Sequence, residues 1–224
     1  MKGIGLKIML VLVASLLITQ CSDSRKMVRQ IDNFSQSWRF NLGDLSDAER
    51  PEYDDSNWRT LDLPHDWSIE GEFSEEHPAT PGGGALPGGI GWYRKTFTVS
   101  EGNKDKSVFI DFDGVYQNSE VWINGHYLGK RPYGYSSFRY ELTPYLNYGD
   151  ENNIIAVKVD NSQQPNSRWY SGSGIYRNVW LVVTDKVFVD HWGTFVTTPE
   201  VSSEAAKINI KTNVRNQTGL DQEV

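Results

Sequence analysis

The chain has 224 residues, of which 38% are hydrophobic, 23% charged and 12% aromatic, and its formal net charge is −7. This composition is typical of a globular protein and excludes a disordered chain. The acidic balance, without a cluster of Lys and Arg in the mature part, excludes a nucleic-acid partner, whereas a neutral or small polar ligand is compatible with it. The length allows one full domain and part of another.

The first segment is predicted to be a signal segment, residues 1–21. Its apolar run, residues 8–18, follows basic residues and is too short to span a membrane, as in a bacterial export signal. The single cysteine, Cys21, has no partner for an internal disulfide. Its position resembles the lipobox of bacterial lipoproteins, although Gln20 stands where a small residue is usual. We expect lipidation at Cys21, with residues 22–30 as a tether. The expected location is either the periplasm or the outer membrane and cell surface. Simple secretion is the alternative.

Alternating apolar and polar residues then dominate the chain. Period-two patterns separated by turn residues predict an antiparallel β-sandwich. The expected strands lie within residues 107–113, 138–142, 153–160, 178–184, 186–198 and 207–214. One helical turn is expected at residues 142–146, with Thr143 as its cap and Pro144 at its first position.

Two β domains are predicted. Residues 31–185 hold enough strands for a complete sandwich, and residues 186–224 begin a second run of strands. That second run is too short to bury a sandwich core of its own. The chain is therefore expected to be the front part of a longer protein.

The pair Asn124–Gly125 lies between two strand patterns and is a strong signal for a two-residue hairpin. Asn124 has two interpretations. Its role is either turn geometry alone, or its side-chain amide, which donates and accepts hydrogen bonds, meets a sugar hydroxyl.

Large planar groups gather on a glycine-rich loop within the stretch "SRWYSGSGIYRNVWL", residues 167–181. Arg168 offers a rigid fork of donors, and Trp169 offers a flat face with a polar tip. Such a loop fits a carbohydrate or a docked domain. The alternative is a packed corner, in which Arg168 pairs with a carboxylate and the aromatic side chains fill the core.

Signals for other chemistry are absent from the sequence. The four histidines are scattered without the spacing of metal ligands, so no metal site is expected. Neither a P-loop nor a nucleophile elbow is present. Carboxylates such as Asp111 and Asp113 alternate with the apolar face of a strand and are expected at the surface. No cofactor is expected.

Several stretches together resemble the N-terminal half of family 2 glycoside hydrolases, especially bacterial β-galactosidases. They occur in the order of that family and cover nearly all of residues 34–198. They are "WRF" (38–40), "LDLPHDWSIEG" (61–71), "LPGGIGWYRKTF" (86–97), "FDGVYQNSEVWINGHYLG" (112–129), "YGYSSFRYELTPYL" (133–146) and "NSRWYSGSGIYRNVWL" (166–181).

The resemblance implies an all-β fold: a jelly-roll β-sandwich of the galactose-binding type, followed by the first strands of an immunoglobulin-like sandwich. It also implies a catalytic barrel with two glutamates that this chain does not contain, so the chain alone is expected to be inactive. In related galactosidases the jelly roll lends a few side chains to the active site. The corresponding residues would be Asn124 and either Asn166 or Arg168, with Trp169 beside them. "HDW" (65–67) and "GWYR" (91–94) are expected to stabilise the domain.

The sequence therefore predicts the carbohydrate-binding portion of a family 2 glycosidase, acting on a galactoside. Two alternatives belong to other classes. One is a stand-alone lectin-like module, and the other is a structural β domain that docks a partner.

Overall fold

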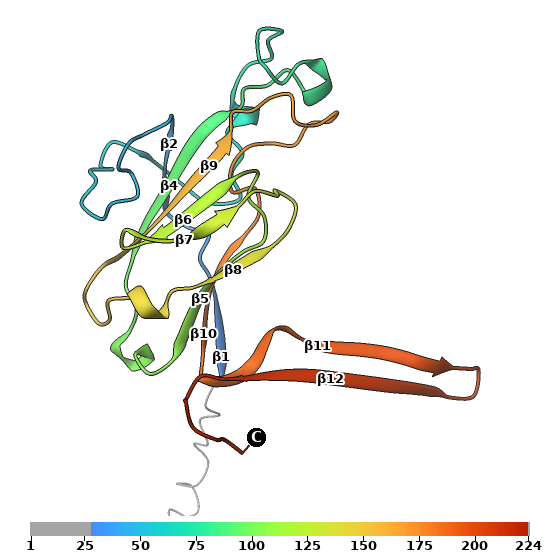
Figure 1. Ribbon diagram of the computed structural model, residues 1–224. Coiled ribbons are helices and arrows are strands. Elements are labelled where there is room, and N and C mark those ends of the chain that lie inside the picture. Colours follow the sequence, from blue (N-terminus) through green and yellow to red (C-terminus); the bar gives the residue numbers. More distant parts are fainter. Residues whose placement is uncertain (1–27, 224) are drawn as a thin grey trace, which may run out of the picture.

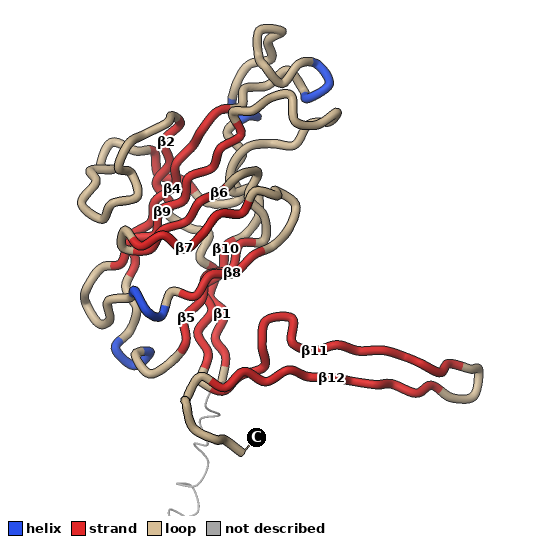
Figure 2. Tube along the Cα trace, in the orientation of Figure 1, coloured by secondary structure: helices blue, strands red, loops and turns tan. Residues whose placement is uncertain are grey.

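The computed structural model describes residues 28–223, and strands dominate them (Figures 1 and 2). A four-stranded antiparallel sheet has the order β1 (Arg29–Asn33), β10 (Val179–Thr184), β5 (Ser107–Phe112) and β8 (Phe138–Glu141). A six-stranded antiparallel sheet has the order β3 (Arg59–Leu61), β2 (Trp38–Leu42), β4 (Gly89–Phe97), β9 (Asn153–Asn161), β6 (Ser119–Ile123) and β7 (His126–Arg131). Neighbours in each sheet are mostly distant in sequence, as in a jelly roll.

The helical segments are single turns of 3-10 helix in the loops (Figure 2). They are η1 (Ser68–Glu70), η2 (Pro81–Gly83), η3 (Glu101–Asn103) and η4 (Thr143–Tyr145). None of the helices in residues 28–223 is long and apolar enough to cross a membrane.

The main core lies between the two sheets. Alternation in β5 turns Val108, Ile110 and Phe112 toward this core, where each is fully buried. From the other sheet, the same alternation in β9 buries Ile155 and Val157 in the same cluster. Removing these side chains from water is the main force that holds the sandwich together. The predicted all-β sandwich is confirmed.

The outer faces of both sheets carry smaller apolar clusters. Trp92 lies on the outer face of the six-stranded sheet and packs with Trp58 and Ala48 of the covering loop, residues 43–58. On the outer face of the four-stranded sheet, Phe109 packs against Phe188, which lies near the start of the strand that follows β10 in the chain. Both sheets therefore bury side chains on their two faces.

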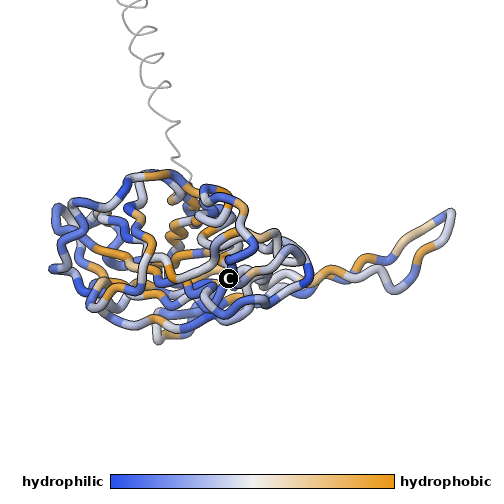
Figure 3. Tube along the Cα trace, turned by 90° about the horizontal axis from the view of Figure 1, so that it is seen from above, coloured by the Kyte–Doolittle hydropathy of each residue, from blue (hydrophilic) through white to orange (hydrophobic). Residues whose placement is uncertain are grey.

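A separate two-stranded hairpin follows, formed by β11 (Val187–Val201) and β12 (Ala206–Asn216). It projects away from the sandwich as an arm (Figure 1), and its apolar and polar residues alternate (Figure 3). Every residue of β12 is exposed. The proposed domain boundary after residue 185 falls between β10 and this arm.

Two local expectations need correction. Strand β1 begins at Arg29, so the predicted tether of residues 22–30 overlaps the first strand by two residues. The helical turn at residues 142–146 is confirmed, but Thr143 does not cap it. Its hydroxyl instead bonds the backbone of Val108 in β5, because the turn lies beside the end of that strand. The signal segment and Cys21 lie outside the described residues.

Candidate carbohydrate site

The glycine-rich loop after β9 is fixed to the domain by backbone pairing. Gly174 and Tyr116 exchange two backbone hydrogen bonds, each 2.9 Å long. On the other side, the amide of His65 donates to the carbonyl of Ile175 at 2.9 Å. Gly174 has a φ of 128°, and a Cβ there would lie 2.4 Å from the Tyr93 hydroxyl. Glycine is required because no other residue allows this close approach.

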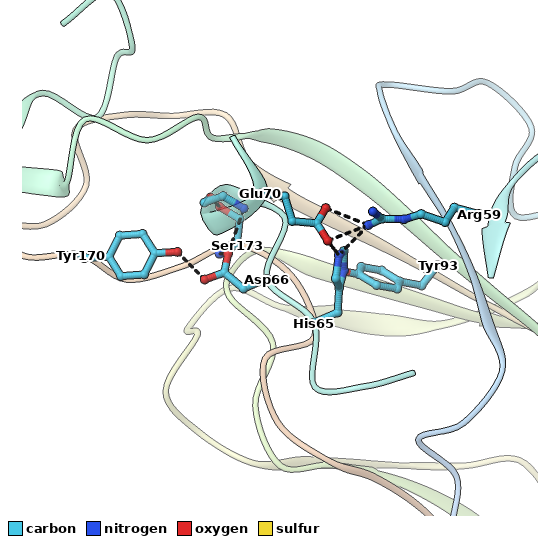
Figure 4. Close-up of polar contacts among 8 residues, drawn as sticks. Arg59, His65, Asp66, Glu70, Tyr93, Tyr170 and Ser173 are labelled. Carbon is cyan, nitrogen blue, oxygen red and sulfur yellow. Dashed lines mark hydrogen bonds and ion pairs between the residues drawn. The ribbon is translucent and has the colours of Figure 1, made fainter. Parts of the chain in front are cut away.

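Asp66 anchors the loop through its carboxylate (Figure 4). Its Oδ1 accepts the backbone amides of Ser68 at 3.0 Å and of Ser173 at 2.8 Å. Its Oδ2 accepts the hydroxyl of Tyr170. Burial, with this carboxylate beside it, raises the pKa of Tyr170 well above its ordinary value, so the phenol stays a donor. Hydrogen bonds to a charged acceptor are the stronger class, so one side chain holds the loop at both Tyr170 and Ser173.

A second cluster of polar side chains lies next to Asp66 (Figure 4) and consists of Arg59, His65, Glu70 and Tyr93. The phenol of Tyr93 contacts Nδ1 of His65 at 2.7 Å, and Glu70 Oε1 lies 3.2 Å from Nε2. The guanidinium nitrogen Nη2 of Arg59 also lies 2.9 Å from Nε2, so this ring nitrogen faces both a donor and a carboxylate. Arg59 donates to both oxygens of Glu70, at 3.0 and 2.8 Å. Burial lowers the pKa of His65, which favours the neutral ring.

Asn161, at the end of β9, connects the anchored loop to the predicted site. Its buried amide donates to the carbonyl of Gly172 at 3.0 Å and to the hydroxyl of Ser173 at 2.7 Å. Its Oδ1 accepts the amide of Asn166 at 2.6 Å. Asn166 is therefore held by a residue that is only 1% exposed.

A pocket of about 240 Å³ opens beside the glycine-rich loop. It is lined by Tyr116, Gln117, Tyr133, Gly134, Tyr135, Asn166, Ser167 and Trp169, and we call it the aromatic pocket. The indole of Trp169 donates to the hydroxyl of Tyr135 at 2.9 Å, and Tyr116 donates to Asn166 at 3.3 Å. Tyr133 and Trp169 remain 62% and 60% exposed, so their faces are open to a ligand.

A larger hollow of about 530 Å³ lies elsewhere, beside the turn of the β11–β12 arm. Its lining includes Pro199, Val201 and Ala205 and has no aromatic side chain. It is open space between the two strands and their turn, whereas the aromatic pocket combines stacking faces with fixed amides. Size is therefore a poor guide to the site here.

The structure brings together only some of the predicted site residues. Asn166 and Trp169 line the aromatic pocket. Arg168 lies between Ser167 and Trp169 in the chain and is exposed, with no carboxylate partner within residues 28–223. The packed-corner alternative is therefore wrong for Arg168 and Trp169.

Asn124 lies in the turn of the β6–β7 hairpin, at the end opposite to the aromatic pocket. Its φ of 49° and that of Gly125, 79°, confirm the predicted turn. Its amide donates to the carbonyl of Tyr145 and to Asn153 Oδ1, both at 2.8 Å, and its oxygen accepts the amide of Ile154 at 2.8 Å. These bonds favour the structural interpretation, and a sugar contact by Asn124 stays a prediction.

Sequence reasoning missed the tyrosines that complete the pocket. Tyr116 precedes β6, and Tyr133 and Tyr135 follow β7, so the hairpin brings them to the same end. A repeated aromatic signal is present in "YGYSS", residues 133–137, but its meeting with Trp169 is a tertiary contact. "HDW" and "GWYR" are confirmed as stabilising segments, since Trp67, Tyr93 and Arg94 are buried.

Metal ligands do not gather in the described part of the chain. No group of three or more His, Cys, Asp or Glu side chains there could hold an ion. The pocket lining also contains no Asp, Glu, Lys or Arg.

Comparison with known proteins identifies the family. The model of the sugar-binding domain of family 2 glycosyl hydrolases matches residues 33–185. A β-galactosidase of Bacteroides ovatus, BoGH2A, is 56% identical over 205 residues, which cover 91% of this chain and 24% of that protein. A putative β-glucuronidase of Formosa agariphila is 42% identical over 216 residues, covering 96% of this chain and 20% of that protein.

Solved structures agree with this relationship. A β-glycosidase from Bacteroides vulgatus has a TM-score of 0.81 at 48% identity, over 84% of this chain and 24% of that one. A Bacteroides uniformis β-glucuronidase has a TM-score of 0.76 at 31% identity, over 85% of this chain and 22% of that one. The chain spans a quarter or less of the length of these relatives. It belongs to glycosyl hydrolase family 2, and residues 33–185 are the sugar-binding domain of that family.

Proposed function

We propose that this chain is the sugar-binding part of an exported β-galactosidase and that its aromatic pocket contacts the galactoside. The observation that carries the proposal is the meeting of Trp169 and Asn166 with three tyrosines around one pocket. Flat aromatic faces stack on the apolar faces of sugars, and amides and phenols donate to and accept from their hydroxyls.

The neutral lining of the pocket favours a galactoside over a glucuronide. A glucuronide carries a carboxylate, which proteins bind best with Arg or Lys. No charged side chain lines the pocket, and Arg168, the nearest in the chain, is not among its lining residues. The β-galactosidase relative is also more similar in sequence than the putative β-glucuronidase, at 56% against 42% identity. A contact between Arg168 and the substrate stays a prediction from the sequence.

The role proposed for the pocket is binding and orientation. Hydrolysis with retention requires two carboxyl groups about 5 Å apart around the scissile bond. Neither Asp nor Glu lines the pocket. The domain would therefore lend contacts to a catalytic centre built by other parts of the enzyme.

The proposal is tested by titrating the chain with methyl β-galactoside and, separately, with methyl β-glucuronide, followed by NMR. We expect weak, millimolar binding of the galactoside and still weaker binding of the glucuronide. Trp169→Ala and Asn166→Ala should weaken galactoside binding by about fivefold or more, the loss of one stacking or hydrogen-bonding group. Phe73→Ala removes an aromatic side chain that is 79% exposed outside the pocket and serves as the control.

Two outcomes would contradict the proposal. Equal binding of the glucuronide would remove the argument from the neutral lining. Micromolar affinity of the chain alone would favour the lectin-like alternative, because a domain that only completes another site has no need for tight binding by itself.

We also propose that Cys21 carries a lipid anchor that holds the exported protein at the cell surface. The support is a single cysteine directly after an apolar export segment. In its native host the protein should partition into detergent, and Cys21→Ser should release it, because buried methylenes provide the membrane affinity. Equal solubility of both forms would leave secretion as the explanation.

A further inference from the structure

A second pair of aromatic side chains, one half-buried and one exposed, lies on the outer face of the six-stranded sheet. Trp122 in β6 pairs with Tyr127 in β7, and their ring centres are 5.4 Å apart. Tyr127 is 52% exposed. We call these two side chains the outer platform. They lie at the turn end of the β6–β7 hairpin, whereas Tyr116 and Tyr133 of the aromatic pocket lie at its open end.

The platform is held rigidly from below. Trp122 stacks on Trp92, with ring centres 5.5 Å apart and planes 28° from parallel. Both tryptophans lie over Ala156, the small residue that pairs with Trp122 in the next strand. Trp92 is 2% exposed, because the covering loop 43–58 closes over it. The exposed ring of Tyr127 thus packs on a preorganised base, which lowers the entropic cost of binding.

Arg94 keeps this loop in place. It is 1% exposed, and its guanidinium donates to Asp55 at 2.9 Å and to the carbonyl of Arg50 at 3.0 Å. The planar fork suits several acceptors at once. The platform is therefore part of a fixed surface.

Two ion pairs of balanced charge lie beside the platform. Glu120 pairs with Lys130 at 3.2 Å, and Lys158 pairs with Asp44 at 2.7 Å. Glu120 lies opposite both lysines in the sheet, two residues from Trp122. Balanced charge gives no attraction for phosphates or uronates. The same groups are donors and acceptors for hydroxyls. A hydrophobic protein partner would instead leave these ions buried at a cost.

We propose that Trp122 and Tyr127 form a second carbohydrate-binding surface, which takes a neutral polysaccharide and is separate from the aromatic pocket. One sugar ring would stack on the exposed ring of Tyr127, which Trp122 supports, with its hydroxyls toward the Glu120–Lys130 pair. Such a surface would hold the protein on its polymeric substrate while the pocket contacts one galactosyl unit.

Affinity electrophoresis of the chain in native gels tests this proposal. The gels contain galactomannan as the neutral probe or polygalacturonate as the anionic probe. Galactomannan should retard the wild type, and polygalacturonate should not. Tyr127→Ala should weaken the galactomannan affinity by about fivefold or more, whereas Tyr127→Phe, which keeps the ring, should stay within about twofold. Phe73→Ala, the exposed control, should leave the retardation intact.

Several results would overturn the proposal. They are no retardation of the wild type by galactomannan, equal retardation of Tyr127→Ala, or loss of retardation in Trp169→Ala, which would assign polymer binding to the pocket. Sedimentation velocity adds another test: a dimer that Tyr127→Ala dissociates would mean that a second copy covers the platform. Failure of the pocket titrations alone would leave the platform standing, since its decisive variants, Tyr127→Ala and Tyr127→Phe, change no residue that lines the pocket.

Discussion

At the scale of single residues, the domain depends on polar side chains that each make several hydrogen bonds. Asp66, Asn161 and Arg94 each make three or more hydrogen bonds, most of them to residues in loops. Loops lack the regular bonds of a sheet, so such side chains satisfy their backbone groups. The pocket residues inherit their positions from these anchors.

Asp66→Ala is expected to loosen the glycine-rich loop. It removes the acceptor of two backbone amides and of the Tyr170 hydroxyl, at a cost of about 2–3 kcal/mol of unfolding free energy. Urea denaturation measures this change, and galactoside binding in the pocket should weaken with it. Asp66→Asn keeps one oxygen for the amides and should cost less. Equal stability of the alanine variant and the wild type would contradict the anchoring role.

Asn124→Gly separates the two interpretations of the hairpin turn. Glycine tolerates the positive φ, so the variant deletes only the amide and its bonds to Tyr145, Asn153 and Ile154. We expect a loss of about 1–2 kcal/mol in the free energy of unfolding, with galactoside binding unchanged. Calorimetry and the NMR titration measure both quantities. Weaker binding at unchanged stability would instead support a sugar contact by Asn124.

The pH dependence of stability should report the neutral state of His65. Burial lowers its pKa below the ordinary value of 6.5, so the unfolded chain takes up a proton before the folded one does as the pH falls. The stability is therefore complete above about pH 6.5 and is lost as the pH falls from there toward the folded pKa. The melting temperature should decrease from pH 7.5 to 5.5.

Two controls isolate this effect. Burial also lowers the pKa of His191, so His191→Gln removes its contribution in the same window. Burial opposes the shift of Glu70, but the interactions with Arg59 and His65 together outweigh it and lower the pKa of that carboxyl, so Glu70 acts only below its ordinary value of 4.5. His65→Gln should flatten the decrease between pH 7.5 and 5.5. An unchanged slope in His65→Gln would show that another group titrates there.

At the scale of elements, the strands of the sandwich and those of the arm differ in what they bury. β5 and β9 lie inside their sheets and bury most of their residues, whereas all of β12 is exposed. The apolar side chains of the arm, such as Ile208 and Ile210, are 62% and 63% exposed. An isolated two-stranded hairpin is marginally stable in water.

The arm should therefore contribute little to the stability of the chain as it stands. Ile210→Lys is expected to change the free energy of unfolding by less than about 0.5 kcal/mol. Ile110→Ala in β5, a fully buried position, should cost about 2–5 kcal/mol and provides the contrast. Denaturant unfolding compares the two. Amide exchange should be fast throughout β12 and slow in β5, and slow exchange in the arm would contradict this view.

At the scale of the whole molecule, the chain combines a sugar-binding domain with an arm and spans a quarter or less of the length of its relatives. Both proposed sites are binding sites for sugar, and the lining of the aromatic pocket contains no pair of carboxylates. Two binding surfaces at opposite ends of one hairpin would let a polymer chain contact both. The arm points away from the sandwich (Figure 1).

The chain alone is expected to hydrolyse no aryl glycoside. Retaining hydrolysis needs a positioned acid and a positioned nucleophile, and the pocket lining offers neither. Purified protein should release only background chromophore from a panel of nitrophenyl glycosides. Turnover that survives repurification would contradict this expectation.

The sequence by itself determined the β-sandwich, the Asn124–Gly125 turn and two of the pocket residues. Alternation and turn chemistry are local, so they can be read without knowing which strands pair. Only the tertiary structure decided that Asp66 anchors the glycine-rich loop and that Tyr116, Tyr133 and Tyr135 meet Trp169. It also showed that the amide of Asn124 is used within the fold. The physical reason is that hydrogen-bond partners and pocket walls come from strands distant in sequence, and their register is fixed only when the sheets pack.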